Sequence, residues 1–425
     1  MLKRVDVLLL MSLAVVSIGF LILNLSKKEP VQPQYTEIHL CRHWDSVFDR
    51  DTMDTLIAEF EERNPLIRIY LSKKTSDTPE PNSADKGNMA ETALGPNTPD
   101  IVFLDDSRLC ALIRDEGLLP LNVFTQNPDN AGQWVIPLSL SMDLLFYNID
   151  ILSAAGFDRP PKTREEFLKY AQVVKAGSGA VYGTALGLHA DDPLAIHREI
   201  FSWLWASGFS VIQDGIPGFE KRALADLIVH LSQVNQTGQP AETPFDKTGS
   251  QQFHEFARGK LAMIIAPAQA ISLLREMPVN FEFGVTHIPG MPVQGISSLG
   301  LSGLYAGISA SCAYPDEAWL FLSFIEENIP AIAAKIKAVP GRLQGLLPSV
   351  KGFSGDYPNE DPLYQKAWDI FESSGLAETF SGYPLAAELE QIIREELFKV
   401  FSGYISPANA AEAIQKRWEV LLVEN

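Results

Sequence analysis

The sequence predicts an α/β protein of two domains that follows an apolar N-terminal helix. Three observations support this prediction. Apolar strands alternate with amphipathic helices along most of the chain, one long apolar stretch is confined to the N-terminus, and the remainder of the 425 residues is too long for one hydrophobic core. A content of 46% hydrophobic, 10% aromatic and 20% charged residues is typical of a globular protein.

A basic start precedes the apolar stretch 7–25, which a pair of lysines closes. As a helix this stretch spans roughly 28 Å, which is close to the hydrocarbon thickness of a bilayer and long for a signal-peptide core. No small-x-small cleavage pattern follows it, and no cysteine for lipid attachment stands at its end. Residues 1–28 therefore predict export, and they favour an uncleaved signal anchor over a cleaved signal peptide. A proline-punctuated linker at 29–35 leads into a domain on the periplasmic or extracytoplasmic face of the membrane.

The charge and the cysteines exclude several classes of protein. A net charge of −19 repels nucleic acid and anionic lipid headgroups, so neither is expected as a partner. Cys41, Cys110 and Cys312 are too few and too scattered for a disulfide framework or a zinc cluster. We expect buried free thiols, with a Cys41–Cys110 bridge as the alternative in an oxidising compartment.

The first folded part is predicted as strand, helix, strand, then again strand and helix. Residues 37–41 and 67–71 alternate in the strand period, and 51–63 carries apolar residues at helical spacing. Residues 100–104 are continuously apolar, which is typical of a strand that is buried on both faces of a parallel sheet. A helix over 107–116 follows. The short joins predict an α/β sheet with right-handed crossovers.

The alternation continues to the C-terminus. Thr163 and Glu166 form a predicted capping box at the start of a helix. Ser406 and Pro407 are an N-cap and an N1 residue of the last helix. The further predicted elements are a helix over 251–257, strands over 261–265, 281–288 and 305–309, and helices over 315–326, 385–401 and 407–422.

Sequence motifs for catalysis are missing. There is no phosphate-binding Gly-x-x-x-x-Gly-Lys loop and no Gly-x-Ser-x-Gly elbow. His39 and His43 lie on a predicted strand and loop, where residues four apart need not converge on a metal. The carboxylates of Asp105–Asp106 and of Asp191–Asp192 are adjacent and diverge, so both pairs are expected in solvated loops. We therefore expect a protein that is not an enzyme, with no cofactor and no metal.

Several motifs occur in the order and spacing of one family. The chain resembles the extracellular solute-binding proteins of carbohydrate ABC transporters, the maltose-binding-protein-like group known as family 1, over about residues 36–422. The stretches that carry the resemblance are Phe60–Ile69, Thr98–Leu104, Gly117–Leu121, Ile136–Asn148, Ala155–Phe167, Phe256–Met263, Phe283–Pro289 and Asp316–Phe324.

The resemblance implies the two-lobed periplasmic-binding-protein fold, in which two α/β lobes are joined by a multi-strand hinge and close around a solute. The implied crossings between lobes lie near 139–146, 284–290 and 325–335. The implied N-terminal lobe comprises 36–142 plus 286–328, and the C-terminal lobe 143–285 plus 329–425. Such a protein needs no catalytic residue, because its product is a closed shape that a membrane permease recognises.

Sugars have apolar faces and hydroxyl edges, so aromatic rings and charged acceptors suit them. The resemblance implies solute contacts at two pairs of residues. Trp44 and Asp45 follow the first strand, and Asp105 and Asp106 follow the strand at 100–104. The alternative is that these residues belong to capping loops. Trp203 is the expected cleft-facing aromatic residue, while the tryptophan two residues later is expected in the core.

Two positions depart from the family. Ser141 stands where an acidic contact is common, and Gln269 replaces a tryptophan that stacks on a sugar ring. This favours a smaller or more polar solute than a maltodextrin. Tyr305 offers another stacking surface, with a core position as the alternative. Arg342 and Tyr383 complete the predicted solute contacts.

The primary hypothesis is the substrate-binding component of an ABC importer, with a small carbohydrate as solute and a permease as partner. The first alternative is a membrane-anchored receptor that reports the solute to a sensor. The second is an exported carbohydrate-active enzyme, which requires two carboxylates roughly 5–9.5 Å apart. The sequence leaves another sugar, a sugar phosphate and a non-sugar open as solutes.

Overall fold

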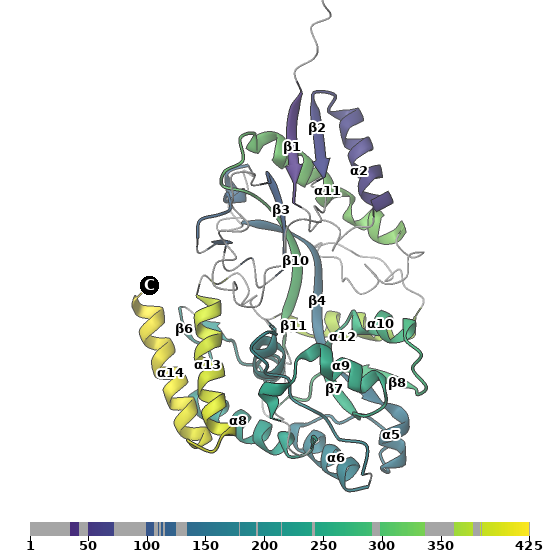
Figure 1. Ribbon diagram of the computed structural model, residues 1–425, viewed down its shortest axis with the longest axis vertical. Helices are drawn as coiled ribbons and strands as arrows, with labels where there is room; N and C mark the ends of the chain where they lie inside the picture. The colour runs from purple at the N-terminus through teal and green to yellow at the C-terminus, as the bar shows by residue number, and fades with distance from the viewer. Residues whose placement is uncertain are drawn as a thin grey trace, which may run out of the picture.

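Figure 1 presents a computed structural model of the chain. The predicted anchor at 7–25 lies outside the residues that the structure describes. Within the described residues no helix combines the length and the apolar character that crossing a membrane requires. The structure describes residues 35–41, 50–71, 99–105, 109, 112–113, 115–124, 134–177, 179–192, 194–213, 215–239, 243–290, 298–335, 361–376, 383 and 385–424.

The first lobe is built on three parallel strands. In β1 (Thr36–Leu40) the residues alternate between buried and more exposed positions, and β1 pairs in parallel with β2 (Ile67–Leu71) and with β3 (Ile101–Asp105). Helix α2 (Arg50–Arg63) packs its apolar face toward α11 (Pro315–Lys335), with Phe60 edge-on to Phe321 at 4.9 Å between ring centroids. The strands predicted over 37–41, 67–71 and 100–104 and the helix predicted over 51–63 are thereby confirmed, while most of the helix predicted over 107–116 lies outside the described residues.

Two long strands connect the lobes: β4 (Val135–Asn148) runs from the first lobe into the second, and β10 (Leu301–Ile308) returns into the first. The two strands are antiparallel to one another, and both run between the upper and lower parts of the molecule (Figure 1). The order β2-β1-β3-β10-β4-β7 makes one mixed sheet, with β8 pairing the far end of β4. The sheet is therefore continuous through the junction of the lobes.

The second lobe continues the sheet with β7 (Met263–Pro267) and β8 (Phe283–Thr286), both antiparallel to β4. Strand β7 begins two residues later than predicted, because Leu261 forms only an isolated bridge to Tyr182. Helices α5 (Ile149–Ala154), α10 (Ala270–Glu276) and α12 (Pro362–Ser373) lie beside this part of the sheet (Figure 1).

Helices make up the rest of the second lobe. The N–H of Glu166 donates to Thr163 Oγ1 at 3.2 Å, so Thr163 caps α6 as predicted. The second half of the predicted capping box does not form, because the Glu166 carboxylate accepts from Arg159 and from the N–H of Lys162 instead of the N–H of Thr163. Ser406 likewise caps the last helix. The helices are α6 (Arg164–Gly177), η4 (His197–Phe201), α7 (Ser202–Ala206), α8 (Lys221–Asn235), α9 (Gly249–Ala257), α13 (Ala386–Phe401) and α14 (Pro407–Glu424).

The remaining elements are short. They are η2 (Leu121–Val123), β5 (Ile212–Gln213), β6 (Ile216–Pro217), η5 (Pro244–Asp246), β9 (Ser298–Leu299) and β11 (Gly375–Leu376). Strand β9 pairs in parallel with β11, and β5 pairs with β6.

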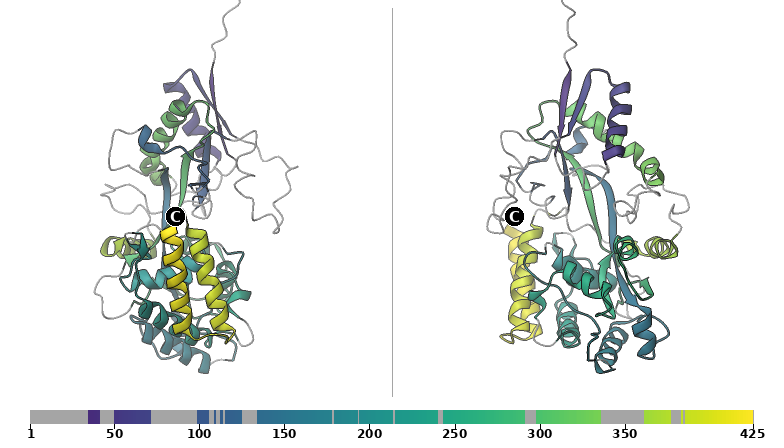
Figure 2. Two further views of the ribbon diagram at one scale, coloured as in Figure 1. Left: turned by 90° about the vertical axis from the view of Figure 1, so that its left-hand side faces the viewer. Right: turned by 45° about the vertical axis from the view of Figure 1, so that its right-hand side comes forward.

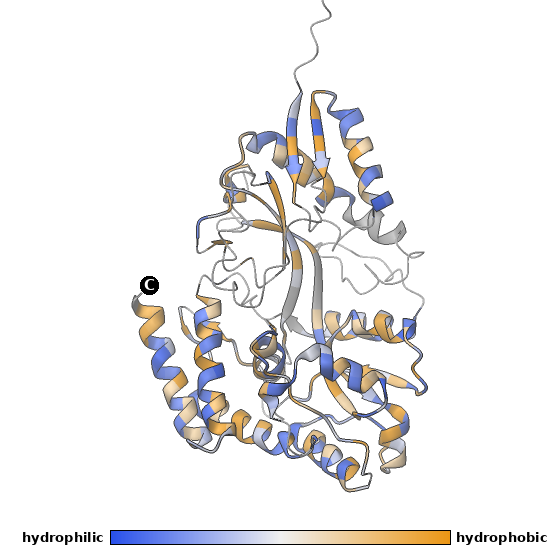
Figure 3. Ribbon diagram, in the orientation of Figure 1, coloured by the Kyte–Doolittle hydropathy of each residue, from blue (hydrophilic) through white to orange (hydrophobic). Residues whose placement is uncertain are grey.

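Separate hydrophobic cores underlie the two lobes. Two clusters draw on residues from 38 to 138 and from 305 to 325, and two others draw on residues from 142 to 299 and from 364 to 418. Both views in Figure 2 keep the part that contains β1, β2 and α2 apart from the part that contains α6, α8, α13 and α14. The helices carry hydrophilic and hydrophobic residues side by side, as amphipathic helices do when they cover a core (Figure 3).

The two described cysteines, Cys41 and Cys312, are half-buried. Cys41 Sγ accepts a hydrogen bond from the N–H of Phe103 at 3.1 Å. Cys110 lies outside the described residues, so the alternative of a Cys41–Cys110 bridge stays a prediction. Burial raises the pKa of Cys312 to about 12, so this thiol stays protonated.

Candidate functional site

The junction of the lobes lies where β4 changes partners. Met142 is the last β4 residue that pairs with β10, opposite Leu301, and Asp143 is the first that pairs with β7, opposite Pro267. The N–H of Ala268 donates to the carbonyl of Met142 at 2.9 Å, which ties the end of β7 to the same point. This change of partners marks the point at which β4 passes from one lobe to the other.

Three of the predicted contact positions converge on this junction. Asp105 ends β3 opposite Leu304 of β10, and Ser139 of β4 lies on the other side of Leu304. Because adjacent strands lie about 4.8 Å apart, the backbones of Asp105 and Ser139 are about 10 Å apart. Ser141 is two residues further along β4, opposite Ser302. The sheet thus brings positions that are far apart in sequence to one edge.

Gln269 reaches the junction from the second lobe. It is half-buried, directly follows Ala268 and precedes the first residue of α10. Helix α10 is fixed by hydrogen bonds of the Tyr364 hydroxyl with the N–H and the hydroxyl of Ser272, and burial raises the pKa of Tyr364 to about 12. Arg275 also pairs with Asp361 at 2.8 Å. The amide of Gln269 can both donate and accept, but it has no ring on which a sugar can stack.

Trp203 does not occupy the position that the sequence predicted. Its side chain is 1% exposed, its ring centroid lies 5.2 Å from that of Phe167 and 5.1 Å from that of His230, and the Arg164 guanidinium lies 5.8 Å from it. These neighbours belong to α6 and α8. The indole therefore packs inside the core of the second lobe and offers no stacking surface.

Two predicted tyrosines also lie against cores. Tyr305 is 6% exposed and is packed with apolar residues such as Val102 and Leu104, which is the core alternative that the sequence left open. Tyr383 is half-buried and packs against the larger core of the second lobe. A role of Tyr383 as a solute contact stays a prediction.

The other predicted contacts lie outside the described residues. They are Trp44, Asp45, Asp106 and Arg342, and each stays a prediction. The side chains of Asp105 and Ser141 are likewise outside the description, so their positions come from the backbone alone.

A buried ionic network, which the sequence motifs did not predict, borders the junction. Asp143 is 7% exposed, accepts a hydrogen bond from Ser202 Oγ at 2.9 Å, and has its Oδ2 3.4 Å from His197 Nδ1. Burial alone would raise the pKa of Asp143, but His197, the positive charge of Arg198 and the Ser202 hydroxyl outweigh it and hold the pKa below its usual value. Asp143 is therefore an ionised group whose partners come from the second lobe.

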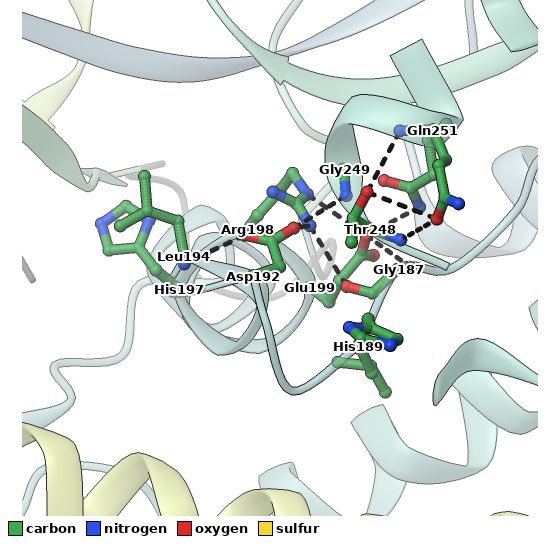
Figure 4. Close-up of polar contacts among 12 residues, drawn as sticks. Gly187, His189, Asp192, Leu194, His197, Arg198, Glu199, Thr248, Gly249 and Gln251 are labelled. Carbon is green, nitrogen blue, oxygen red and sulfur yellow. Dashed lines mark hydrogen bonds and ion pairs between the residues drawn. The ribbon is translucent and has the colours of Figure 1, made fainter. Parts of the chain in front are cut away.

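The network continues through a single π-helical turn, η4. Arg198 donates to Asp192 at 2.7 Å and to the carbonyl of Gly187 at 3.1 Å, and Asp192 accepts from the N–H of Gly249 at 2.7 Å (Figure 4). The prediction that Asp191–Asp192 is a solvated loop is thus wrong for Asp192. Its carboxylate joins the first residue of α9 to η4.

Glu199 completes the network. It accepts hydrogen bonds from the N–H of Gly187 at 3.1 Å and from Gln252 Nε2 at 2.9 Å. Burial raises the pKa of Glu199 despite the nearby Arg198. Burial would lower the pKa of Arg198, but the charges of Glu199 and Asp192 raise it above its usual value, so the guanidinium stays charged. The sequence contains a signal for this network, because the three ionisable residues His197, Arg198 and Glu199 stand inside the apolar run 194–206.

The described residues include no group of three or more histidine, cysteine, aspartate or glutamate side chains placed to hold a metal ion. The network instead fixes η4 against β4, the loop at Gly187 and α9. Its chemistry is that of a rigid support beside the junction of the lobes.

The fold and the position of the junction define the class of protein as a two-lobed α/β binding protein. The family model for bacterial extracellular solute-binding proteins matches residues 50–328, which is more than half of the chain. The chain therefore belongs to this family of bacterial extracellular solute-binding proteins.

Curated relatives support this at lower coverage. A binding protein of Brucella abortus (strain 2308) and one of Brucella suis biovar 1 (strain 1330) are each 26% identical over 195 residues, which is 45% of this chain and 46% of the relative. The matched region thus spans about half the length of these relatives.

Solved structures share the fold over nearly the whole chain. The GacH receptor of Streptomyces glaucescens, solved with acarbose, is 17% identical with a TM-score of 0.67 and covers 92% of this chain and 99% of its own. UgpB of Mycobacterium tuberculosis, solved with glycerophosphocholine, is 19% identical with a TM-score of 0.67 and the same coverage. The cyclic alpha-maltosyl-1,6-maltose binding protein of Arthrobacter globiformis is 18% identical with a TM-score of 0.69. The match covers 92% of this chain and 100% of the Arthrobacter chain.

Proposed function

We propose that this chain is the substrate-binding component of an ABC importer, which captures a small carbohydrate between its lobes and delivers it to a membrane permease. The observation that carries the proposal is the convergence of Asp105, Ser141 and Gln269 at the point where β4 passes from one lobe to the other. These residues come from the first lobe, the crossing strand and the second lobe. A solute that contacts all three would favour the closed arrangement of the lobes.

The proposed solute is a sugar or a short oligosaccharide. GacH was solved with acarbose, and the Arthrobacter protein is named for binding cyclic alpha-maltosyl-1,6-maltose. UgpB was solved with glycerophosphocholine, a polar phosphodiester, so the fold serves solutes of several kinds. Gln269 provides hydrogen bonds in place of a stacking ring, which favours a small or strongly polar ligand. Trp44, Asp45, Asp106 and Arg342 are proposed as further contacts, and the lobe boundaries predicted from the sequence belong to the same proposal.

The proposed location is the outer face of the cell membrane, with residues 7–25 as an anchor that holds the receptor near its permease. No step of this function breaks or forms a covalent bond. The release of solute to the permease requires only that the lobes reopen.

The experiment is mass spectrometry of small molecules that copurify with the protein, followed by a thermal-shift panel of mono- and oligosaccharides. A ligand at a hundred times its Kd should stabilise the protein by about 2.7 kcal/mol. For the carbohydrate with the largest shift, Gln269→Ala should weaken binding about tenfold, since a buried hydrogen bond is lost. Gln172→Ala, at an exposed glutamine of α6, is the control. The proposal fails if no carbohydrate shifts the melting temperature.

A further inference from the structure

A buried arginine in the core of the second lobe is bound by neutral groups only. Arg164, the first residue of α6, is 5% exposed. Its Nη2 donates to the carbonyl of Trp203 at 3.0 Å and to Ser207 Oγ at 2.8 Å. The Ser207 hydroxyl donates in turn to the same carbonyl at 2.7 Å. None of these acceptors carries a charge that could balance the guanidinium.

The charge of Arg164 is therefore poorly compensated. Arg198, another buried arginine of this lobe, has two carboxylates within 3.4 Å. Arg164 has the more distant charges of Glu165 and Asp226, which are both exposed residues, and the Trp203 ring 5.8 Å away. Burial lowers the pKa of Arg164 to about 10, so the guanidinium is still charged at neutral pH. A buried charge of this kind is costly unless an opposite charge accompanies it.

Three nitrogen atoms around this charge have no hydrogen-bond partner within the part of the chain that the structure describes. They are Arg164 Nε, Trp203 Nε1 and His230 Nε2, and each of these atoms is buried. The side chains of Trp203 and His230 are themselves buried. Buried polar groups in folded proteins are nearly always hydrogen-bonded, so three unpartnered atoms in one place indicate a bound species.

The side chains that carry these atoms are packed together. The ring centroid of Trp203 lies 5.2 Å from that of Phe167 and 5.1 Å from that of His230. Phe167 follows Arg164 by one turn of α6, and its ring centroid lies 6.2 Å from that of His230. We call Arg164, Phe167, Trp203, Ser207 and His230 the Arg164 cluster. All five residues are buried between α6, α7 and α8.

The chemistry of the unpartnered atoms selects the species. A guanidinium Nε and an indole Nε1 can only donate hydrogen bonds, and a neutral histidine can donate from Nε2 in one of its tautomers. Donors beside a positive charge bind an anion more strongly than a neutral acceptor. Because every member of the Arg164 cluster is buried, the anion must be small. Chloride meets these conditions, and water is the neutral alternative.

We propose that the Arg164 cluster binds a chloride ion inside the second lobe, with Arg164 Nε and Trp203 Nε1 as donors. The ion neutralises the guanidinium and joins α6 to α7 and α8, so the stability of this lobe depends on chloride. The site contains none of the residues proposed to contact the solute, and it does not rest on the proposed function.

The test is thermal unfolding of the full chain, without solute, while chloride replaces gluconate at constant ionic strength. Gluconate is too large for an enclosed site, and constant ionic strength keeps the screening of surface charges equal. The melting temperature should rise with chloride and level off, by about 2–4 °C at ten times the Kd of the ion. Bromide should replace chloride, and crystals grown in bromide should show its anomalous scattering beside Arg164 and Trp203.

Two variants locate the ion. Arg164→Gln removes the charge and should abolish the response to chloride. Trp203→Phe keeps a ring in the core but removes one donor, so about tenfold more chloride should be needed for the same response. Arg394→Gln is the matched control, because this half-buried arginine of α13 also donates to backbone carbonyls of the second lobe, at 2.7 Å and 3.0 Å. Its response to chloride should equal that of the wild type.

Two outcomes overturn the inference. One is a melting temperature that does not change with chloride at constant ionic strength, with no bromide signal at the Arg164 cluster, which would leave only a neutral water there. The other is a wild-type response in Trp203→Phe, which would place the ion elsewhere; this variant decides the question if Arg164→Gln does not fold. Because no solute is present, both outcomes are independent of the ligand panel.

Discussion

The indole of Trp205 covers the backbone of Gly300 so closely that a β-carbon there would stand 1.8 Å from ring carbon Cζ3. Trp205 is 1% exposed and is flanked by His197 and Phe201, with ring centroids 4.8 Å and 5.8 Å away. The ring has no space into which it can withdraw. Gly300 is therefore required for close packing of α7 against the segment that enters β10.

The substitution Gly300→Ala should destabilise the protein by about 1–3 kcal/mol, the usual cost of forcing an extra carbon into a packed core. Urea unfolding followed by tryptophan fluorescence measures the change. Gly179→Ala is the control, since a β-carbon at Gly179 meets nothing within 4 Å, and its effect should stay within about 0.5 kcal/mol. Equal stabilities of the two variants would contradict the close packing.

Removal of the Arg198 side chain tests the buried network. Arg198→Ala leaves Asp192 and Glu199 without their cation in a buried site, so the free energy of unfolding should fall by about 3–5 kcal/mol. Arg222→Ala removes a surface arginine that is 90% exposed and 3.9 Å from Asp226, and it should cost less than about 1 kcal/mol. Chemical denaturation of both variants beside the wild type gives the comparison.

His230 should make stability depend on pH. Burial, together with the charge of Arg164, lowers the pKa of His230 from 6.5 to about 4. Between these values the unfolded chain binds a proton that the folded protein does not, so this contribution is complete above pH 6.5 and is lost as the pH falls toward 4. At 1.36 kcal/mol per pKa unit the loss is about 3 kcal/mol.

The measurement is the free energy of unfolding across that pH range for the wild type and for His230→Gln. The variant lacks the titrating ring. Between pH 6.5 and pH 4 its free energy of unfolding should therefore fall by about 3 kcal/mol less than that of the wild type. His254→Gln removes an exposed histidine of α9 and should keep the wild-type slope. A wild-type slope in His230→Gln would assign the pH dependence to other groups.

The local features of this fold could be predicted from the sequence, because their causes are local. Thr163 and Ser406 start their helices as expected, since a side-chain oxygen three residues upstream of a free N–H caps it in almost any context. The parallel strands of the first lobe were also predicted, since their apolar pattern and short joins define them. The start of β7 was misplaced because Leu261 is apolar but finds only one partner, Tyr182.

The features near the junction depend on contacts between distant parts of the chain. His197, Arg198 and Glu199 are polar residues within an apolar run, and their partners Asp143, Asp192 and Gln252 lie up to 54 positions away. Sequence spacing does not reveal such pairs. The same limit explains Trp203, because whether an indole faces the junction or the core depends on α6 and α8.

A crosslink between β4 and β10 at the junction of the lobes offers a direct test of whether these two crossing strands must twist for the solute to bind. Leu140 and Gly303 are directly opposite one another, and opposed residues in antiparallel strands have Cα atoms about 4.5–5.5 Å apart, which suits a disulfide. In the double variant Leu140→Cys with Gly303→Cys, the oxidised protein should bind the carbohydrate with the largest thermal shift about tenfold more weakly than the reduced protein, because twisting of the two paired strands is restrained. Isothermal titration before and after reduction measures the difference.

Tyr147→Cys with Gly284→Cys is the control. It joins an opposed pair of β4 and β8 within the second lobe, and its affinity for the same carbohydrate should be equal in both redox states. Equal affinities of the oxidised and reduced forms of the Leu140→Cys with Gly303→Cys variant would show that binding does not need the strands to twist at this pair.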